Sequence, residues 1–247
     1  MSFFQLMRAI LALAIIPFLT LLVCLACYID VHWGRHSSFK ALQFPRIWGK
    51  AACWFAGIRV RVEGHENLDP EQTYIFVGNH TSQTDIMTFQ GYIPHNFRWI
   101  AKKELFAIPL FGAAMRAVEF IPIDRSRGRQ AVKSLNNAAR RIAEGSSVLI
   151  FPEGTRSPDG HLQPFKTGAI MLAIKAGVPV VPVGFNGTYQ ALPKGSLLTR
   201  GGDVVLRIGA PLPTKDFQAK DKQELARKLQ KLVASLLDQC HQPLSAE

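Results

Sequence analysis

The chain opens with a long apolar stretch. Residues 9–29 contain no charged side chain over 21 positions. As a helix this stretch would be about 30 Å long, close to the hydrocarbon thickness of a bilayer, with a kink expected at Pro17. We predict a retained membrane anchor. A cleaved signal peptide is the alternative, but only Arg8 precedes the stretch, and the stretch is long for a signal peptide.

A second apolar pattern follows over residues 42–58, where large apolar side chains recur at three- and four-residue spacing. Arg46 and Lys50 lie elsewhere on the helical wheel, and Trp48 and Trp54 are on the apolar side. This pattern is typical of a basic interfacial helix, with an ordinary surface helix as the alternative. Either the first helix spans the bilayer or the two helices enter one leaflet as a hairpin. The excess of Lys and Arg after the first helix predicts that this flank is cytoplasmic.

The pattern changes near residue 59, where Val60 and Val62 alternate with Arg59, Arg61 and other polar residues. This alternation is typical of a half-buried strand. Further strands are predicted at residues 73–77, 97–100, 119–123, 147–151, 178–185 and 204–208, and helices at 130–144, 167–176 and 221–237. Strands that alternate with helices predict an α/β fold with a mixed, largely parallel sheet flanked by helices. We therefore divide the chain into membrane-anchoring helices (1–58) and one globular domain (59–247).

Composition and charge narrow the class of partner. Apolar residues make up 48% of the 247 residues and charged residues 19%, which excludes a disordered chain. The net charge of +11 favours an anionic partner: nucleic acid, anionic lipid or a phosphorylated substrate. Cys24 and Cys27 form a Cys-x-x-Cys pair inside the apolar stretch with no second pair of ligands. We interpret them as small hydrophobic residues rather than a metal or redox site.

The first candidate site lies at residues 77–85, where an apolar strand ends and His80 and Asp85 follow. Sites in α/β sheets gather at the carboxyl ends of strands. The two side chains can meet if His80 lies in the turn before a helix and Asp85 in its first turn. Ser82 and Asp85 have the spacing of a capping-box variant, so the alternative is that Asp85 only caps the helix.

Two more polar stretches follow predicted strands. Residues 150–157 would present Glu153, Gly154, Thr155 and Arg156 at the same sheet edge, and a guanidinium fork suits a phosphate or carboxylate. Residues 119–129 would deliver Arg125. The alternatives are a plain turn and a solvated basic loop.

Two familiar catalytic motifs are missing. Residues 160–167 imitate a phosphate-binding loop but lack the glycine before the lysine, and no Gly-x-Ser-x-Gly occurs. A histidine that acts as general base on a substrate hydroxyl is then the simplest mechanism.

Four blocks together resemble the glycerolipid acyltransferase family, and in particular its bacterial 1-acyl-sn-glycerol-3-phosphate acyltransferases. They are Asn79-His80 with Asp85, residues 120–125 (FIPIDR), residues 151–157 (FPEGTRS) and residues 180–183 (VVPV). A later Lys-x-Gly, residues 166–168, also fits. The resemblance implies a glycerol-3-phosphate acyltransferase-like fold. It also implies acyl transfer from acyl-CoA or acyl-carrier protein to the free hydroxyl of lysophosphatidate, which yields phosphatidate in phospholipid biosynthesis.

The resemblance also implies roles for residues and partners. His80 would be the base and Asp85 its partner, while the acceptor would be held by Glu153, Gly154, Thr155, Arg156, Arg125 and Lys103. No metal or cofactor is expected, and the enzyme would act at the cytoplasmic face of the inner membrane, on membrane lipids and not on nucleic acid. Another lyso-lipid acceptor, or a non-catalytic membrane-binding member of the fold, stays open as an alternative.

Overall fold

The N-terminal segment forms the two helices that the apolar pattern predicts. The computed structural model describes residues 2–34, 38–124 and 128–239. Helix α1 (Phe3–His32) begins with a capping box, in which Ser2 and Gln5 each accept the other's backbone N–H. The short α2 (Ser38–Ala41) leads into α3 (Gln43–Ala56), which ends at Gly57 in the left-handed conformation. Helix α1 is long and apolar enough to cross a membrane.

Seven strands form one mixed sheet in the order β1-β7-β6-β2-β5-β3-β4. All neighbouring pairs are parallel except β6 with β7. The predicted fold class is therefore confirmed, and each predicted strand is present within a few residues of its expected bounds. The strands are β1 (Ile58–Glu63), β2 (Ile75–Gly78), β3 (Arg98–Lys102), β4 (Ile121–Ile123), β5 (Val148–Ile150), β6 (Val180–Asn186) and β7 (Gly202–Ile208).

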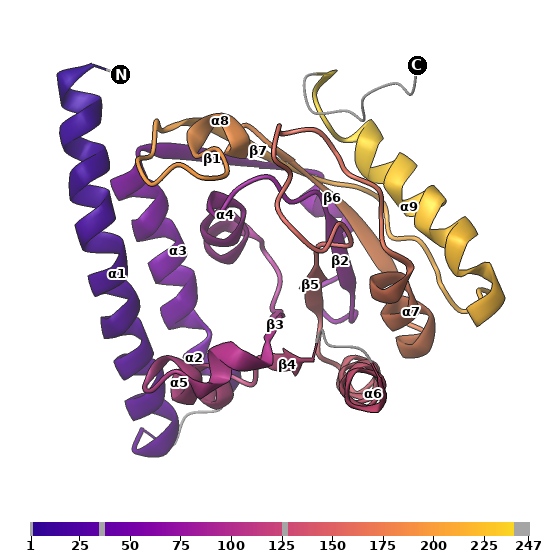
Figure 1. Ribbon diagram of the computed structural model, residues 1–247. Helices are drawn as coiled ribbons and strands as arrows, with labels where there is room; N and C mark the ends of the chain where they lie inside the picture. Colours follow the sequence, from indigo (N-terminus) through magenta and orange to yellow (C-terminus); the bar gives the residue numbers. More distant parts are fainter. Residues whose placement is uncertain (1, 35–37, 125–127, 240–247) are drawn as a thin grey trace.

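Helices cover both faces of the sheet (Figure 1). One face packs against α6 (Arg129–Ala143), α7 (Thr167–Ala176) and α9 (Lys222–Ser235), the three helices that the sequence predicts in this domain. The other face packs against α3 and α4 (Thr84–Tyr92), with Phe76, Phe89 and Phe185 fully buried between the layers. Because both faces are covered, the central strands are continuously apolar.

Several short elements had no clear signal in the sequence. Helix α4 is buried around most of its circumference, so its residues show no amphipathic period. Gly91 on α4 meets Gly49 on α3 so closely that a Cβ on Gly49 would lie 2.5 Å from the Gly91 nitrogen. The remaining short elements are α5 (Phe111–Ala117), α8 (Thr188–Ala191), and the 3-10 helices η1 (His65–Asn67), η2 (Lys103–Ala107) and η3 (Ala219–Asp221).

Helix α3 combines the two interpretations considered for residues 42–58. Its small residues Ala52, Cys53 and Ala56 are buried in the domain core, as a packed surface helix requires. Trp54 remains 72% exposed, which suits an interfacial helix. Trp48 instead packs toward α1, where its indole Nε1 donates to Thr20 Oγ1 at 2.9 Å.

Candidate active site

The site begins where β2 and β5 end side by side. These strands are parallel neighbours, with Val77 opposite Ile150, so the chain segments after them leave the sheet at the same edge. The segment after β2 carries His80, and the segment after β5 carries Glu153. The expectation that the two blocks meet at the carboxyl ends of strands is met by this topology.

Asn79 ties the first segment to β6. Its Oδ1 accepts the Phe185 N–H at 2.7 Å and its Nδ2 donates to the Phe185 carbonyl at 3.0 Å. The amide therefore continues the strand pairing one residue beyond β2. At Gly78, a Cβ would lie 2.6 Å from the Phe185 ring, so only glycine fits this close approach.

His80 and Asp85 are in direct contact. The imidazole Nδ1 lies 2.8 Å from Asp85 Oδ2, and the carboxylate is fully buried while the imidazole is 16% exposed. A carboxylate only accepts, so Nδ1 carries the proton and Nε2 keeps its lone pair. This is the arrangement that a general base needs.

Asp85 also fastens the turn before α4. Its Oδ2 accepts the backbone N–H groups of Thr81 and Ser82, each at 2.9 Å. The Ser82 hydroxyl accepts the Thr84 N–H at 3.1 Å, one residue short of a full capping box. Asp85 is thus both a helix-start residue and the partner of His80, so the two interpretations hold together.

The segment after β5 holds the peptide of His80 from both sides. The His80 N–H donates to Glu153 Oε1 at 2.8 Å, and the His80 carbonyl accepts the Ser157 N–H at 2.7 Å. The ring of His80 stacks on Phe151 with centroids 4.0 Å apart. The histidine is therefore held at its backbone, at Nδ1 and on one ring face.

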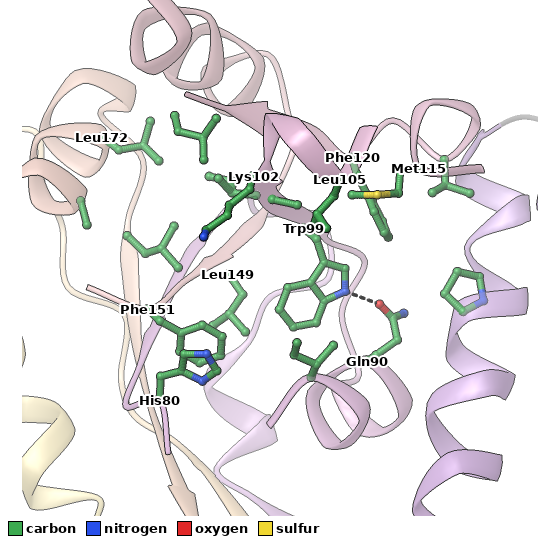
Figure 2. Close-up of a pocket in the computed structure, with 18 of the residues that line it drawn as sticks. His80, Gln90, Trp99, Lys102, Leu105, Met115, Phe120, Leu149, Phe151 and Leu172 are labelled. Carbon is green, nitrogen blue, oxygen red and sulfur yellow. Dashed lines mark hydrogen bonds between the residues drawn. The ribbon is translucent and has the colours of Figure 1, made fainter. Parts of the chain in front are cut away.

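A largely apolar cavity of about 1050 Å³ starts at His80 (Figure 2). Its lining comes from α1, α3, α4, η2, α5, α6, α7 and the sheet. It includes Cys24, Cys27, Ile86, Trp99, Leu105, Met115, Val118, Phe120, Leu135, Leu149 and Leu172. Trp99 is held in this lining by its Nε1, which donates to Gln90 Oε1 at 2.6 Å. The cavity can accept an extended apolar chain.

Two lysines bring positive charge to this apolar lining. Figure 2 shows Lys102 pointing into the cavity, toward the side on which Phe151 and His80 lie. Lys166 lines it too, with Nζ 2.9 Å from the position that a Cβ on Gly154 would occupy. Lys102 is not among the site residues predicted from the sequence. The signal that could have found it is the length of β3, because neighbouring residues at a strand end point to opposite faces.

The other predicted site residues are spread around this centre. Gly154, with a φ of 76°, lines the cavity, and Thr155 is exposed beside it. Arg156 is half-buried and lies outside the described cavity lining, and its carbonyl accepts Lys194 Nζ at 2.8 Å. Lys103 pairs with Asp124 at 2.7 Å. Arg125 falls outside the described residues.

The chain is similar to known acyltransferases in sequence and in fold. A model of the Acyltransferase family matches residues 59–186, which include His80, Asp85 and residues 151–157. A 1-acyl-sn-glycerol-3-phosphate acyltransferase from Cocos nucifera is 33% identical over 202 residues, 81% of this chain and 65% of that protein. A chloroplastic enzyme of the same description from Brassica napus is 40% identical over 61% of this chain and 44% of its own. The chain thus spans less than two thirds of the length of either relative.

A solved structure matches over nearly its full length. The crystal structure of the 1-acyl-sn-glycerophosphate acyltransferase PlsC from Thermotoga maritima aligns with a TM-score of 0.70 and 30% identity, covering 90% of this chain and 96% of that one. The family resemblance inferred from the four sequence blocks is therefore confirmed. The match includes the two segments whose side chains meet at His80, and the chain belongs to the Acyltransferase family.

Proposed function

We propose that the protein is a 1-acylglycerol-3-phosphate O-acyltransferase that converts lysophosphatidate to phosphatidate. One observation carries this proposal: a histidine paired through Nδ1 with a buried carboxylate lines an apolar cavity that also contains two lysines. The relatives and the solved structure described above carry the same activity in their names.

The chemistry follows from the pairing of His80 with Asp85. Nε2 takes the proton from the free glycerol hydroxyl, and the oxygen attacks the thioester carbonyl of acyl-CoA or acyl-carrier protein. A C–O bond forms, the C–S bond breaks, and the imidazolium returns its proton to the leaving thiolate. Asp85 holds the tautomer and stabilises the positive charge on the ring during the transfer.

The apolar cavity and the cationic side chains around it bind different parts of the substrates. An acyl chain inside the apolar lining gains about 0.8 kcal/mol for each buried methylene. Lys102 and Lys166 are placed to attract the acceptor phosphate, together with the sequence-based candidates Gly154, Thr155, Arg156, Arg125 and Lys103. Arg156→Lys should raise the KM for the phosphorylated acceptor, because one ammonium cannot replace a guanidinium fork. An unchanged acceptor KM would remove Arg156 from this group.

The N-terminal segment gives the reaction its location. Helix α1 indicates membrane association, and its large side chains include many that are exposed. We place residues 1–58 as the anchor, residues 59–247 as the acyltransferase domain, and that domain at the cytoplasmic face of the inner membrane. Lysophosphatidate and phosphatidate reside in the bilayer, while the thioester donor is cytosolic. The net charge of +11 favours anionic lipid at this surface.

The decisive experiment measures thiol release from acyl-CoA by the purified protein in lipid vesicles, with and without lysophosphatidate. We expect release that requires lysophosphatidate and that falls by about 10²–10⁴-fold in His80→Ala, with the fold intact. Equal release without the acceptor would contradict the proposed acceptor, and normal turnover by His80→Ala would contradict the base. A panel of other lyso-acceptors, compared by kcat/KM, distinguishes lysophosphatidate from an alternative headgroup.

A further inference from the structure

Glu153 lies beneath the active site rather than in it. Its side chain is 2% exposed and is not among the residues that line the cavity. Oε1 accepts the His80 N–H at 2.8 Å, and the backbone N–H of Gln163 also hydrogen bonds to this carboxyl group. Oε2 is buried and makes no hydrogen bond with any part of the chain that the structure describes. Every observed polar contact of Glu153 is therefore with backbone.

The surroundings of Glu153 differ from those of the other buried carboxyl group at His80. Asp85 contacts an imidazole that can become positive, whereas Glu153 is hydrogen bonded only to neutral N–H groups. Burial raises the pKa of Glu153 to about 8 against the opposing effect of the His80 and Gln163 N–H donors. The charges of Asp85 and Asp159 act in the same direction as burial. The fold therefore favours the uncharged form of this carboxyl group more than water does.

We propose that Glu153 is a positioning residue, whose buried carboxyl group holds the backbone of His80 and contacts neither substrate. This assignment rests on the proposed acyltransfer and replaces the acceptor-binding role that the family resemblance implies for Glu153. The His80 carbonyl is held independently by the Ser157 N–H, so the peptide plane on each side of the histidine has one partner from the segment after β5. Fixing both sides of the residue sets the direction of its Cα–Cβ bond and hence of Nε2.

A loss of this contact should act on the rate of the chemical step. A small displacement of a general base lowers the rate steeply, and a residue that never contacts the acceptor leaves its KM unchanged. Glutamine matches the uncharged form of Glu153 in shape and keeps an oxygen for the His80 N–H. Alanine removes the carboxyl oxygen that accepts the His80 N–H, and it leaves that N–H buried without a hydrogen-bond partner.

The test compares Glu153→Ala and Glu153→Gln with the wild type at pH 7. Glu144→Gln, at the exposed residue that follows α6, is the surface-carboxylate control. We expect Glu153→Ala to lose roughly 10–100-fold in kcat with little change in acceptor KM. Glu153→Gln should recover most of that loss. A rise in acceptor KM in Glu153→Gln, or a kcat for Glu153→Gln as low as that of Glu153→Ala, would overturn the assignment. If Glu153→Ala does not fold, the kcat and KM of Glu153→Gln decide alone.

A second measurement needs no turnover and separates this inference from the proposed function. Hydrogen exchange of the His80 amide should be faster in Glu153→Ala and close to wild type in Glu153→Gln. If the wild type catalyses no acyl transfer but this exchange pattern holds, the proposed function fails while the backbone contact stands. Unchanged exchange in Glu153→Ala would contradict the contact itself.

Discussion

The imidazole of His80 lies almost parallel to the phenyl ring of Phe151, with an interplanar angle of 10° and ring centroids 4.0 Å apart. The stack holds one face of the imidazole and keeps water from it. Phe151 in turn packs against Phe185, whose backbone binds Asn79. The Phe151 ring therefore links the imidazole of His80 to Phe185, the residue that also binds the neighbouring Asn79.

Replacing this ring should lower the rate without removing the base. Aromatic pairs contribute about 0.5–1.5 kcal/mol beyond their buried area, so we expect Phe151→Leu to reduce kcat by roughly 2- to 13-fold. Phe151→Tyr, which keeps a ring, is the matched control. Steady-state thiol release checks this, and an unchanged kcat in Phe151→Leu would show that the stack does not position the imidazole.

Asp85→Asn should affect both turnover and stability. The amide keeps the shape of the carboxylate but lacks the charge that fixes the tautomer of His80, so kcat should fall by about 10²-fold or more. The same oxygen accepts the Thr81 and Ser82 N–H groups, so thermal unfolding should occur at a lower temperature. Circular dichroism and thiol release on one preparation measure the two effects. If Asp85→Asn is destabilised but keeps the full rate, Asp85 acts only at the start of the helix and not in the reaction.

Lys102 and Lys103 offer a matched pair at one strand end. Lys102 lines the cavity, whereas Lys103 is paired with Asp124 at 2.7 Å. We expect Lys102→Met to raise the KM for lysophosphatidate more than Lys103→Met does, because its ammonium points toward the side of the cavity where His80 lies. Acceptor titrations at saturating acyl-CoA measure the difference. The opposite order would favour Lys103, the residue chosen from the sequence.

The protonation of Glu153 makes a prediction about stability and pH. Burial raises the pKa of Glu153 from its ordinary value of 4.5 to about 8 in the fold, so between these values the native state holds a proton that the unfolded state releases. The contribution is fully present below about pH 4.5 and is lost as the pH rises toward 8. Glu153→Gln cannot titrate, so its unfolding midpoint relative to wild type should rise across this window. A constant difference from pH 5 to 9 would show that Glu153 is ionised throughout.

The sequence predicted the parts of the fold that have a strong period or a long apolar run. Helix α7 begins and ends at the predicted residues, and the central strands are recognisable because both faces are covered. For helix α4, only the beginning could be predicted, from the spacing of Ser82 and Asp85. A helix that is buried on most sides has no polar face to mark its turns.

The candidate site could be predicted as a set of residues but not as a geometry. The spacing of His80 and Asp85 allowed their contact but left helix capping by Asp85 as an alternative. The orientation of Glu153 was not available, because a residue in an irregular turn after a strand can face the cavity or the backbone of the neighbouring segment. The choice between Lys102 and Lys103 depended on where β3 ends, and a shift of one residue exchanges the two faces of a strand.

Helix α1 supplies part of the cavity wall through Thr20, Val23, Cys24 and Cys27, while many of its other side chains are exposed. A truncation designed to make a soluble enzyme would therefore remove part of the compartment in which the acyl chain is expected to lie. A generic transmembrane segment grafted in its place would tether the domain but leave the compartment open on that side. For protein engineering, helix α1 and the apolar cavity therefore have to be redesigned as one unit.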